Sequence, residues 1–168
     1  ELYEKDLKST SVPLVVAAHS LGGHLMSQYI YDIQFKSRIA KTVRHLIPKQ
    51  ELSAFEKFQT HIGMLTFGCN IPLFTFAYET LKPIVFPGAG LTQAHAAVAR
   101  WYNYFDADDV LGYPLKVLRG YEHVISEDIE VNVGSLLTDW NAASHSKYWS
   151  DSDFVKPVAK FLGTALDV

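Results

Sequence analysis

The residue best suited to nucleophilic chemistry is Ser20, which follows an apolar segment and has a small residue two positions before it and another two positions after it. Residues 17–23 read Ala-Ala-His-Ser-Leu-Gly-Gly, so Ala18 and Gly22 lie two positions to either side of Ser20. Small residues at these positions let a strand and the following helix approach closely around a strained turn that exposes the serine hydroxyl. The backbone N–H of Leu21, at the start of that helix, is then a candidate oxyanion donor.

Ser20 needs two partners to react. A serine hydroxyl is a weak nucleophile until a base takes its proton, and a carboxylate must orient that base. The chain offers a group of acids at Asp106, Asp108 and Asp109, and it holds seven histidines. Ser20 and these groups can react together only if the fold gathers them at one place, so the predicted elements must be considered next.

A buried strand is predicted directly before Ser20. Residues 12–18 form a continuous apolar run rich in β-branched side chains, which is typical of a strand buried on both faces of a parallel sheet. Three further strands are predicted at residues 62–67, 101–105 and 129–133. Strands that alternate with helices indicate an α/β fold. We therefore expect residues 1–168 to form a single domain with a mostly parallel sheet of about four strands, flanked by helices.

Helices are predicted between these strands. Apolar side chains recur every four residues at Leu21, Leu25 and Tyr29, which predicts an amphipathic helix directly after Ser20. Three other helices are expected: a short one opened by a capping box between Ser53 and Glu56, one over residues 91–99, and a closing one over residues 153–162 with Ser152 as its N-cap. Residues 71–90, with three Pro and two Gly, are predicted to be irregular.

Composition narrows the classes of function. Hydrophobic residues make up 48% and charged residues 20% of the chain, as in ordinary globular domains. A net charge of −3 argues against nucleic acid as a partner, and no apolar run reaches the ~20 residues needed to span a bilayer. The single cysteine, Cys69, excludes an internal disulfide, favours a cytoplasmic location and is expected in the core. The histidines show no metal-site spacing, so we predict neither a metal nor a cofactor.

The segment around Ser20 resembles the nucleophile elbow of the α/β-hydrolase superfamily, and of its lipase- and esterase-like members in particular. Ala18 stands where the family usually has Gly, a change that also occurs in bacterial lipases. Residues 67–72, Phe-Gly-Cys-Asn-Ile-Pro, are similar to a segment that follows the sixth strand of lipases. The resemblance covers the chain from the strand before Ser20 onward, which corresponds to the C-terminal part of the family fold.

The resemblance implies an acid between the nucleophile and a histidine in chain order. The aspartate-rich segment after the third predicted strand is similar to the acid loop of lipase-like hydrolases. Its spacing to Tyr113 and Leu115 assigns the acid to Asp109. A looser match leaves Asp108 as the alternative, and Asp106 is a third candidate.

The resemblance also implies a base. His145 follows the fourth predicted strand, where the family fold places its histidine, and the pattern His-x-x-Tyr-Trp is similar to the histidine segment of some lipases and phospholipases. His123, which precedes that strand, is the rival. His19 is expected to point away from Ser20, and His24 falls one helical turn beyond the elbow.

These assignments imply a serine hydrolase that cleaves a small-molecule or lipid carboxylic ester through an acyl-enzyme. Two alternatives stay open. One is a hydrolase-derived domain that does not catalyse, and the other is an acyltransferase that uses the same three residues. Residues 1–11 are polar and offer no strand to pair with residues 12–18. We therefore expect an exposed apolar edge strand that promotes self-association, no second oxyanion donor, and little activity from these 168 residues by themselves.

Overall fold

The centre of the molecule is a four-stranded parallel sheet. The computed structural model describes residues 3–8, 12–39, 52–78, 81–133 and 144–167. The strands follow the chain in spatial order: β1 (Leu14–His19), β2 (His61–Phe67), β3 (Arg100–Phe105) and β4 (Glu127–Glu130). All three pairings are parallel, so the carboxyl ends of the four strands lie at one edge. The predicted fold class, a mostly parallel sheet of about four strands flanked by helices, is confirmed.

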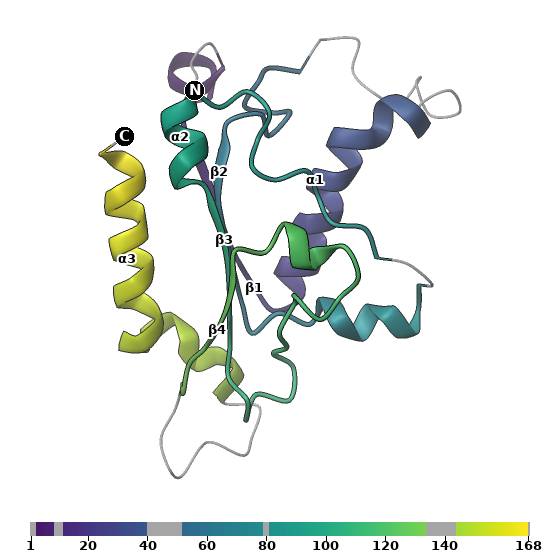
Figure 1. Ribbon diagram of the computed structural model, residues 1–168, viewed down its shortest axis with the longest axis vertical. Coiled ribbons are helices and arrows are strands. Elements are labelled where there is room, and N and C mark those ends of the chain that lie inside the picture. Colours follow the sequence, from purple (N-terminus) through teal and green to yellow (C-terminus); the bar gives the residue numbers. More distant parts are fainter. Residues whose placement is uncertain (1–2, 9–11, 40–51, 79–80, 134–143, 168) are drawn as a thin grey trace.

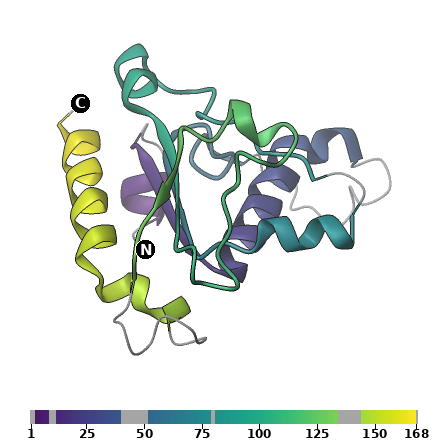
Figure 2. The same ribbon diagram turned by 60° about the horizontal axis from the view of Figure 1, so that its bottom comes forward.

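Helices cover both faces of the sheet. The long helix α1 (Leu21–Ile39) lies on one side and α3 (Ser152–Leu166) on the other, in both views of the ribbon (Figures 1 and 2). A third helix, α2 (Gln93–Val98), leads into β3. Four short helical segments complete the described elements: η1 (Tyr3–Leu7), η3 (Ile71–Phe76), η4 (Tyr121–His123) and η5 (Ser144–Ser150). Of these, η3 lies within the stretch that was predicted to be irregular.

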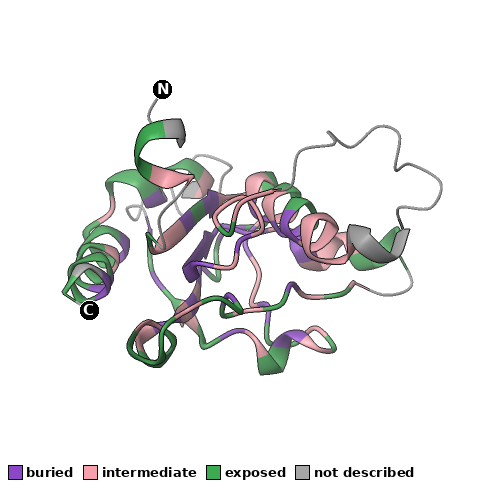
Figure 3. Ribbon diagram, turned by 90° about the horizontal axis from the view of Figure 1, so that it is seen from above, coloured by how far each residue is buried: buried purple, intermediate pink, exposed green. Residues whose placement is uncertain are grey.

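The core lies on the two faces of β2, which is buried along its whole length. Successive side chains of a strand point to opposite faces. Accordingly, Met64 packs in one cluster with Ile30 of α1, and Leu65 packs in another with Phe161 of α3. Figure 3 shows the buried residues concentrated on the strands, with exposed residues on the outer sides of the helices.

Strand β1 has a neighbour on one side only among the described residues, because it pairs with β2 alone. Val16 and Ala18 are buried, but Ala17 between them is exposed. Within the part of the chain that the structure describes, β1 thus lies at the edge of the sheet, and Ala17 is exposed near the turn. This differs from the prediction of burial on both faces.

The structure differs from the predictions in two places: the helix expected after Ser53 is absent from the described residues, and α3 has another N-cap. The capping box forms, because Ser53 N–H donates to Glu56 at 2.8 Å and Glu56 N–H donates to Ser53 Oγ at 3.2 Å. Residues 54–60 nevertheless form turns, since Phe58 has a φ of 54° that a helix cannot contain. At the start of α3 the N-cap is Asp151 and not Ser152, because the Asp151 carboxylate accepts from Asp153 N–H at 2.8 Å.

The fourth strand begins two residues earlier than predicted, at Glu127 instead of Ile129. Its second residue, Asp128, has a carboxylate that accepts from Asn103 Nδ2 at 2.7 Å and from the N–H groups of Leu115 and Lys116 at 2.9 and 2.8 Å. These three hydrogen bonds stabilise the Asp128 carboxylate within the sheet. They also tie β4 to the segment that follows β3.

Candidate active site

Ser20 occupies a strained turn between β1 and α1. Its φ of 55° lies in the left-handed region, which costs an L-residue about 1–2 kcal/mol. Two backbone hydrogen bonds hold this conformation: Ser20 N–H donates to Phe67 O at 3.0 Å, and Ser20 O accepts from Gly23 N–H at 3.0 Å. The turn therefore presents the Ser20 hydroxyl at the carboxyl edge of the sheet, directly ahead of the N-terminus of α1.

A chain of two hydrogen bonds joins three of the predicted residues. His145 Nε2 lies 2.6 Å from Ser20 Oγ, and His145 Nδ1 lies 2.8 Å from Asp109 Oδ2. A carboxylate can only accept, so Nδ1 carries the proton of the neutral imidazole. Nε2 is then free to accept from the Ser20 hydroxyl, which is the arrangement needed to remove its proton.

The Asp109 carboxylate is buried and fully engaged. Its side chain is only 1% exposed. Besides His145, it accepts from Leu111 N–H at 3.0 Å through Oδ1 and from the Tyr148 hydroxyl at 3.1 Å through Oδ2. Burial, with the negative charge of Asp109 as a second cause, raises the pKa of Tyr148, so the phenol keeps its proton and remains a donor.

The other two acids of the loop have different surroundings. Asp108 is exposed, and its N–H donates to Asp106 Oδ1 at 2.8 Å. Asp106 is buried and accepts from Val133 N–H at 2.7 Å through Oδ2. Asp106 thus ties the loop after β3 to the segment after β4. Of the three candidates, Asp109 is the one that contacts His145.

Comparison of the chain with protein-family models, with curated proteins and with solved structures finds no match. The chemistry of this site is therefore inferred from its geometry and from the residues that surround it. Two further residues lie beside the hydrogen-bonded chain: Gly68 and His19.

Gly68 lies against the site, although no role was predicted for it. A side chain at this position would place its Cβ 3.0 Å from the Tyr148 ring, 3.1 Å from His145 Cε1 and 3.2 Å from Asp109 Oδ2. Its φ of +52° also favours glycine. The signals in the sequence were its place directly after a buried strand and its position within residues 67–72, the segment that resembles part of the lipases.

His19, which was expected to point away from Ser20, contacts His145. Its Nε2 lies 2.7 Å from the backbone oxygen of His145, and the two imidazole centroids are 4.7 Å apart.

Three other histidines, His24, His61 and His123, lie in different environments. The ring of His24 stacks on Phe74, with centroids 3.7 Å apart. His123 is exposed and lies 3.5 Å from Glu122. Burial lowers the pKa of His61, which lies in the core, to about 4. None of these contacts involves Ser20 or Asp109.

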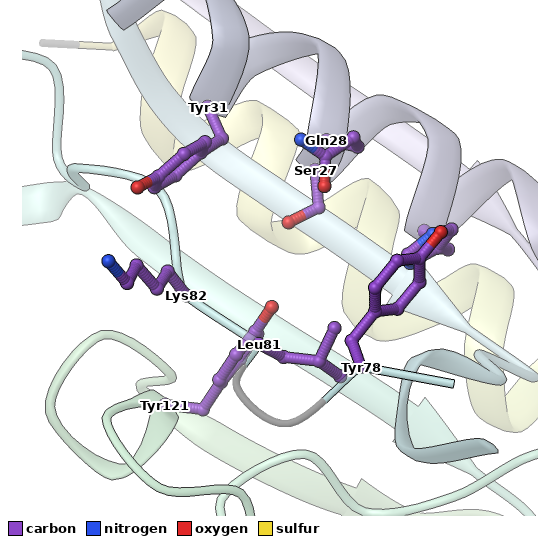
Figure 4. Close-up of a pocket in the computed structure, with 8 residues that line it drawn as sticks. Ser27, Gln28, Tyr31, Tyr78, Leu81, Lys82 and Tyr121 are labelled. Atoms are coloured by element: carbon purple, nitrogen blue, oxygen red, sulfur yellow. The ribbon is translucent and has the colours of Figure 1, made fainter. Parts of the chain in front are cut away.

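A pocket of about 130 Å³ lies along α1. Figure 4 shows Ser27 and Tyr31 on the α1 wall and Tyr121 across the cavity. Ser27 also hydrogen-bonds to Tyr121, and neither Ser20 nor His145 lines the pocket. Within the described part of the chain, no group of His, Cys, Asp and Glu is arranged to bind a metal, and no helix is long and apolar enough to cross a membrane.

Proposed function

We propose that this protein is a serine hydrolase of the α/β-hydrolase superfamily, similar to lipases and esterases, that cleaves carboxylic esters through an acyl-enzyme. The hydrogen-bonded chain Ser20–His145–Asp109, with contacts of 2.6 and 2.8 Å, carries the proposal. A strained turn at the nucleophile supports it, because the turn holds the hydroxyl where a substrate can reach it.

In the first half of the reaction, Ser20 Oγ attacks the carbonyl carbon of the ester while His145 Nε2 takes the hydroxyl proton. The tetrahedral intermediate then collapses. The bond from carbon to the alcohol oxygen breaks, and His145 gives its proton to that oxygen. Asp109 keeps the imidazole in the reactive tautomer and stabilises its positive charge throughout.

The second half releases the acid. A water molecule attacks the acyl carbon as His145 Nε2 takes its proton. The bond from the acyl carbon to Ser20 Oγ breaks, and the proton returns to that oxygen. Both intermediates carry a negative oxygen, and the N–H of Leu21 at the start of α1 is its proposed donor.

The surroundings of Ser20 favour an ester with an apolar acyl group. Leu21 follows Ser20 directly and is 46% exposed. Trp149 is 60% exposed, and its ring lies 6.0 Å from that of His19. Exposed apolar side chains beside a reactive serine offer contact area to a hydrocarbon chain.

The test is hydrolysis of p-nitrophenyl butyrate by the full-length protein and its Ser20→Ala variant. We expect kcat to fall by ~10³-fold or more, because the acyl-enzyme route is lost. Ser152→Ala, at an exposed position in the first turn of α3, is the matched control and should keep full activity. Equal activity in the wild type and Ser20→Ala would refute the proposal, and an inert wild type would favour the non-catalytic alternative.

A further inference from the structure

We propose that His19 is a positioning residue that holds His145 against Ser20. The inference rests on the proposed function, since it takes His145 to be the base. It adds a specific requirement, namely a hydrogen-bond donor on the residue before the nucleophile.

The first support is a hydrogen bond between two distant segments. His19 Nε2 lies 2.7 Å from the backbone oxygen of His145, 126 residues away in the chain. A carbonyl oxygen can only accept, so His19 Nε2 carries the proton and donates it. This bond joins the end of β1 to η5. It therefore fixes the two segments whose reacting atoms, Ser20 Oγ and His145 Nε2, must stay 2.6 Å apart.

The second support is the packing of the His19 ring. Its centroid lies 4.7 Å from that of His145 and 5.2 Å from that of Phe67, with interplanar angles of 34° and 23°. Phe67 is completely buried at the end of β2. Movement of the His19 ring would therefore break its contacts with the base and with the core together.

The third support is charge. Among the described residues, the titratable groups that face His19 are His145, Asp109 and Tyr148. Burial is the main cause that lowers the pKa of His19. A neutral His19 can still donate through Nε2, and it leaves His145 free to gain a proton during the reaction without a second positive charge beside it.

A role in positioning predicts more than a role in filling space. Gln and Met have side chains of the same length, but only Gln carries an N–H donor. His19→Gln should therefore retain the bond to the His145 carbonyl, and His19→Met should lose it while filling similar volume. If His19 only fills space, the two variants should behave alike.

The experiment measures kcat and KM for p-nitrophenyl butyrate, and the unfolding curve, for the wild type, His19→Gln, His19→Met and Ser20→Ala. We expect His19→Met to lower kcat by about 10- to 100-fold with KM changed less than about twofold, since a displaced base impairs the chemical step more than binding. His19→Gln should recover at least half of the lost activity on a logarithmic scale.

Three results would overturn the inference. The first is a kcat for His19→Met equal to that of the wild type. The second is an equal loss of kcat in His19→Met and His19→Gln. The third is a His19→Met protein that loses its fold, which would indicate a purely structural role. An inert wild type, by contrast, would refute the proposed function itself and this inference with it.

Discussion

The hydroxyl of Tyr148 lies 3.1 Å from Asp109 Oδ2, the same oxygen that lies 2.8 Å from Nδ1 of His145. Tyr148 also accepts from the N–H of Asp106 at 2.9 Å. It follows His145 by three residues, so the segment that carries the proposed base also holds the proposed acid. The buried hydroxyl of Tyr148 therefore couples η5 to the loop that holds Asp106 and Asp109.

This coupling predicts the effect of Tyr148→Phe. The substitution removes one donor to Asp109 and leaves the buried Asp106 N–H without its acceptor, so the free energy of unfolding should fall by about 1–3 kcal/mol. Ester hydrolysis should slow by about tenfold, because the carboxylate loses part of its orientation. Tyr113→Phe is the control, since its hydroxyl donates to the oxygen of Val110 in the acid loop. Similar losses from both variants in urea unfolding and kcat would contradict the special role of Tyr148.

The acid loop supplies a matched pair of variants. Asp109→Asn should lower kcat by up to ~10⁴-fold, because an amide can stabilise the wrong tautomer of His145 and cannot balance its charge. Asp108→Asn should change kcat little, since that side chain is exposed. The measurement is kcat for p-nitrophenyl butyrate in both variants. The opposite order of effects would move the acid to Asp108.

The two glycines after Ser20 should differ in their tolerance of a side chain. A Cβ on Gly23 would lie 2.5 Å from the Sγ of buried Cys69, whereas a Cβ on Gly22 meets no described atom within 4 Å. Gly23→Ala should therefore lower the free energy of unfolding by about 1–3 kcal/mol through overpacking. Gly22→Ala should leave it unchanged or raise it by up to about 1 kcal/mol, since Ala favours a helix. Urea unfolding tests both, and equal destabilisation would be the contrary result.

His61 predicts a loss of stability in acid. Burial lowers its pKa from 6.5 to about 4. Between these values the unfolded chain binds the proton more readily than the folded chain, so stability rises with pH and is lost as pH falls from 6.5 towards 4. The loss from this group should reach about 3 kcal/mol. Replacing His61 with Phe should flatten the dependence in urea unfolding between these pH values, whereas exposed His123→Gln should not. An unchanged slope in His61→Phe would contradict the prediction.

The sheet was predictable because its strands carry strong local signals. The β-branched run at residues 12–18 and the apolar segment at 62–67 identify β1 and β2 without tertiary information. The start of β4 was missed because Glu127 and Asp128 are poor strand residues. Asp128 is stabilised in β4 by its hydrogen bond to Asn103, 25 residues earlier. That contact exists only in the folded chain.

The candidate site, like the sheet, contains some residues that could be predicted from the sequence and others that could not. Ser20 could be proposed from residue type and the small-residue turn around it, whereas Asp109 and His145 were proposed through the resemblance of their segments to lipase-like hydrolases. Gly68 and His19 could not, because their importance depends on where the backbone turns at the sheet edge. The geometry also corrects the expectation that Gly22 must be small, because a Cβ there would meet no described atom within 4 Å, whereas a Cβ on Gly23 would contact Cys69 Sγ.

The most direct test of the central claim is covalent labelling with a fluorophosphonate probe, which reacts with a serine only when that serine is activated as a nucleophile. Labelled protein is digested, and the modified residue is found by mass spectrometry. We predict one adduct, on Ser20, that is absent from Ser20→Ala and strongly reduced in His145→Ala, while His123→Ala is labelled like the wild type. An unlabelled wild type, or an adduct that persists in Ser20→Ala, would contradict the proposal that Ser20 is the nucleophile.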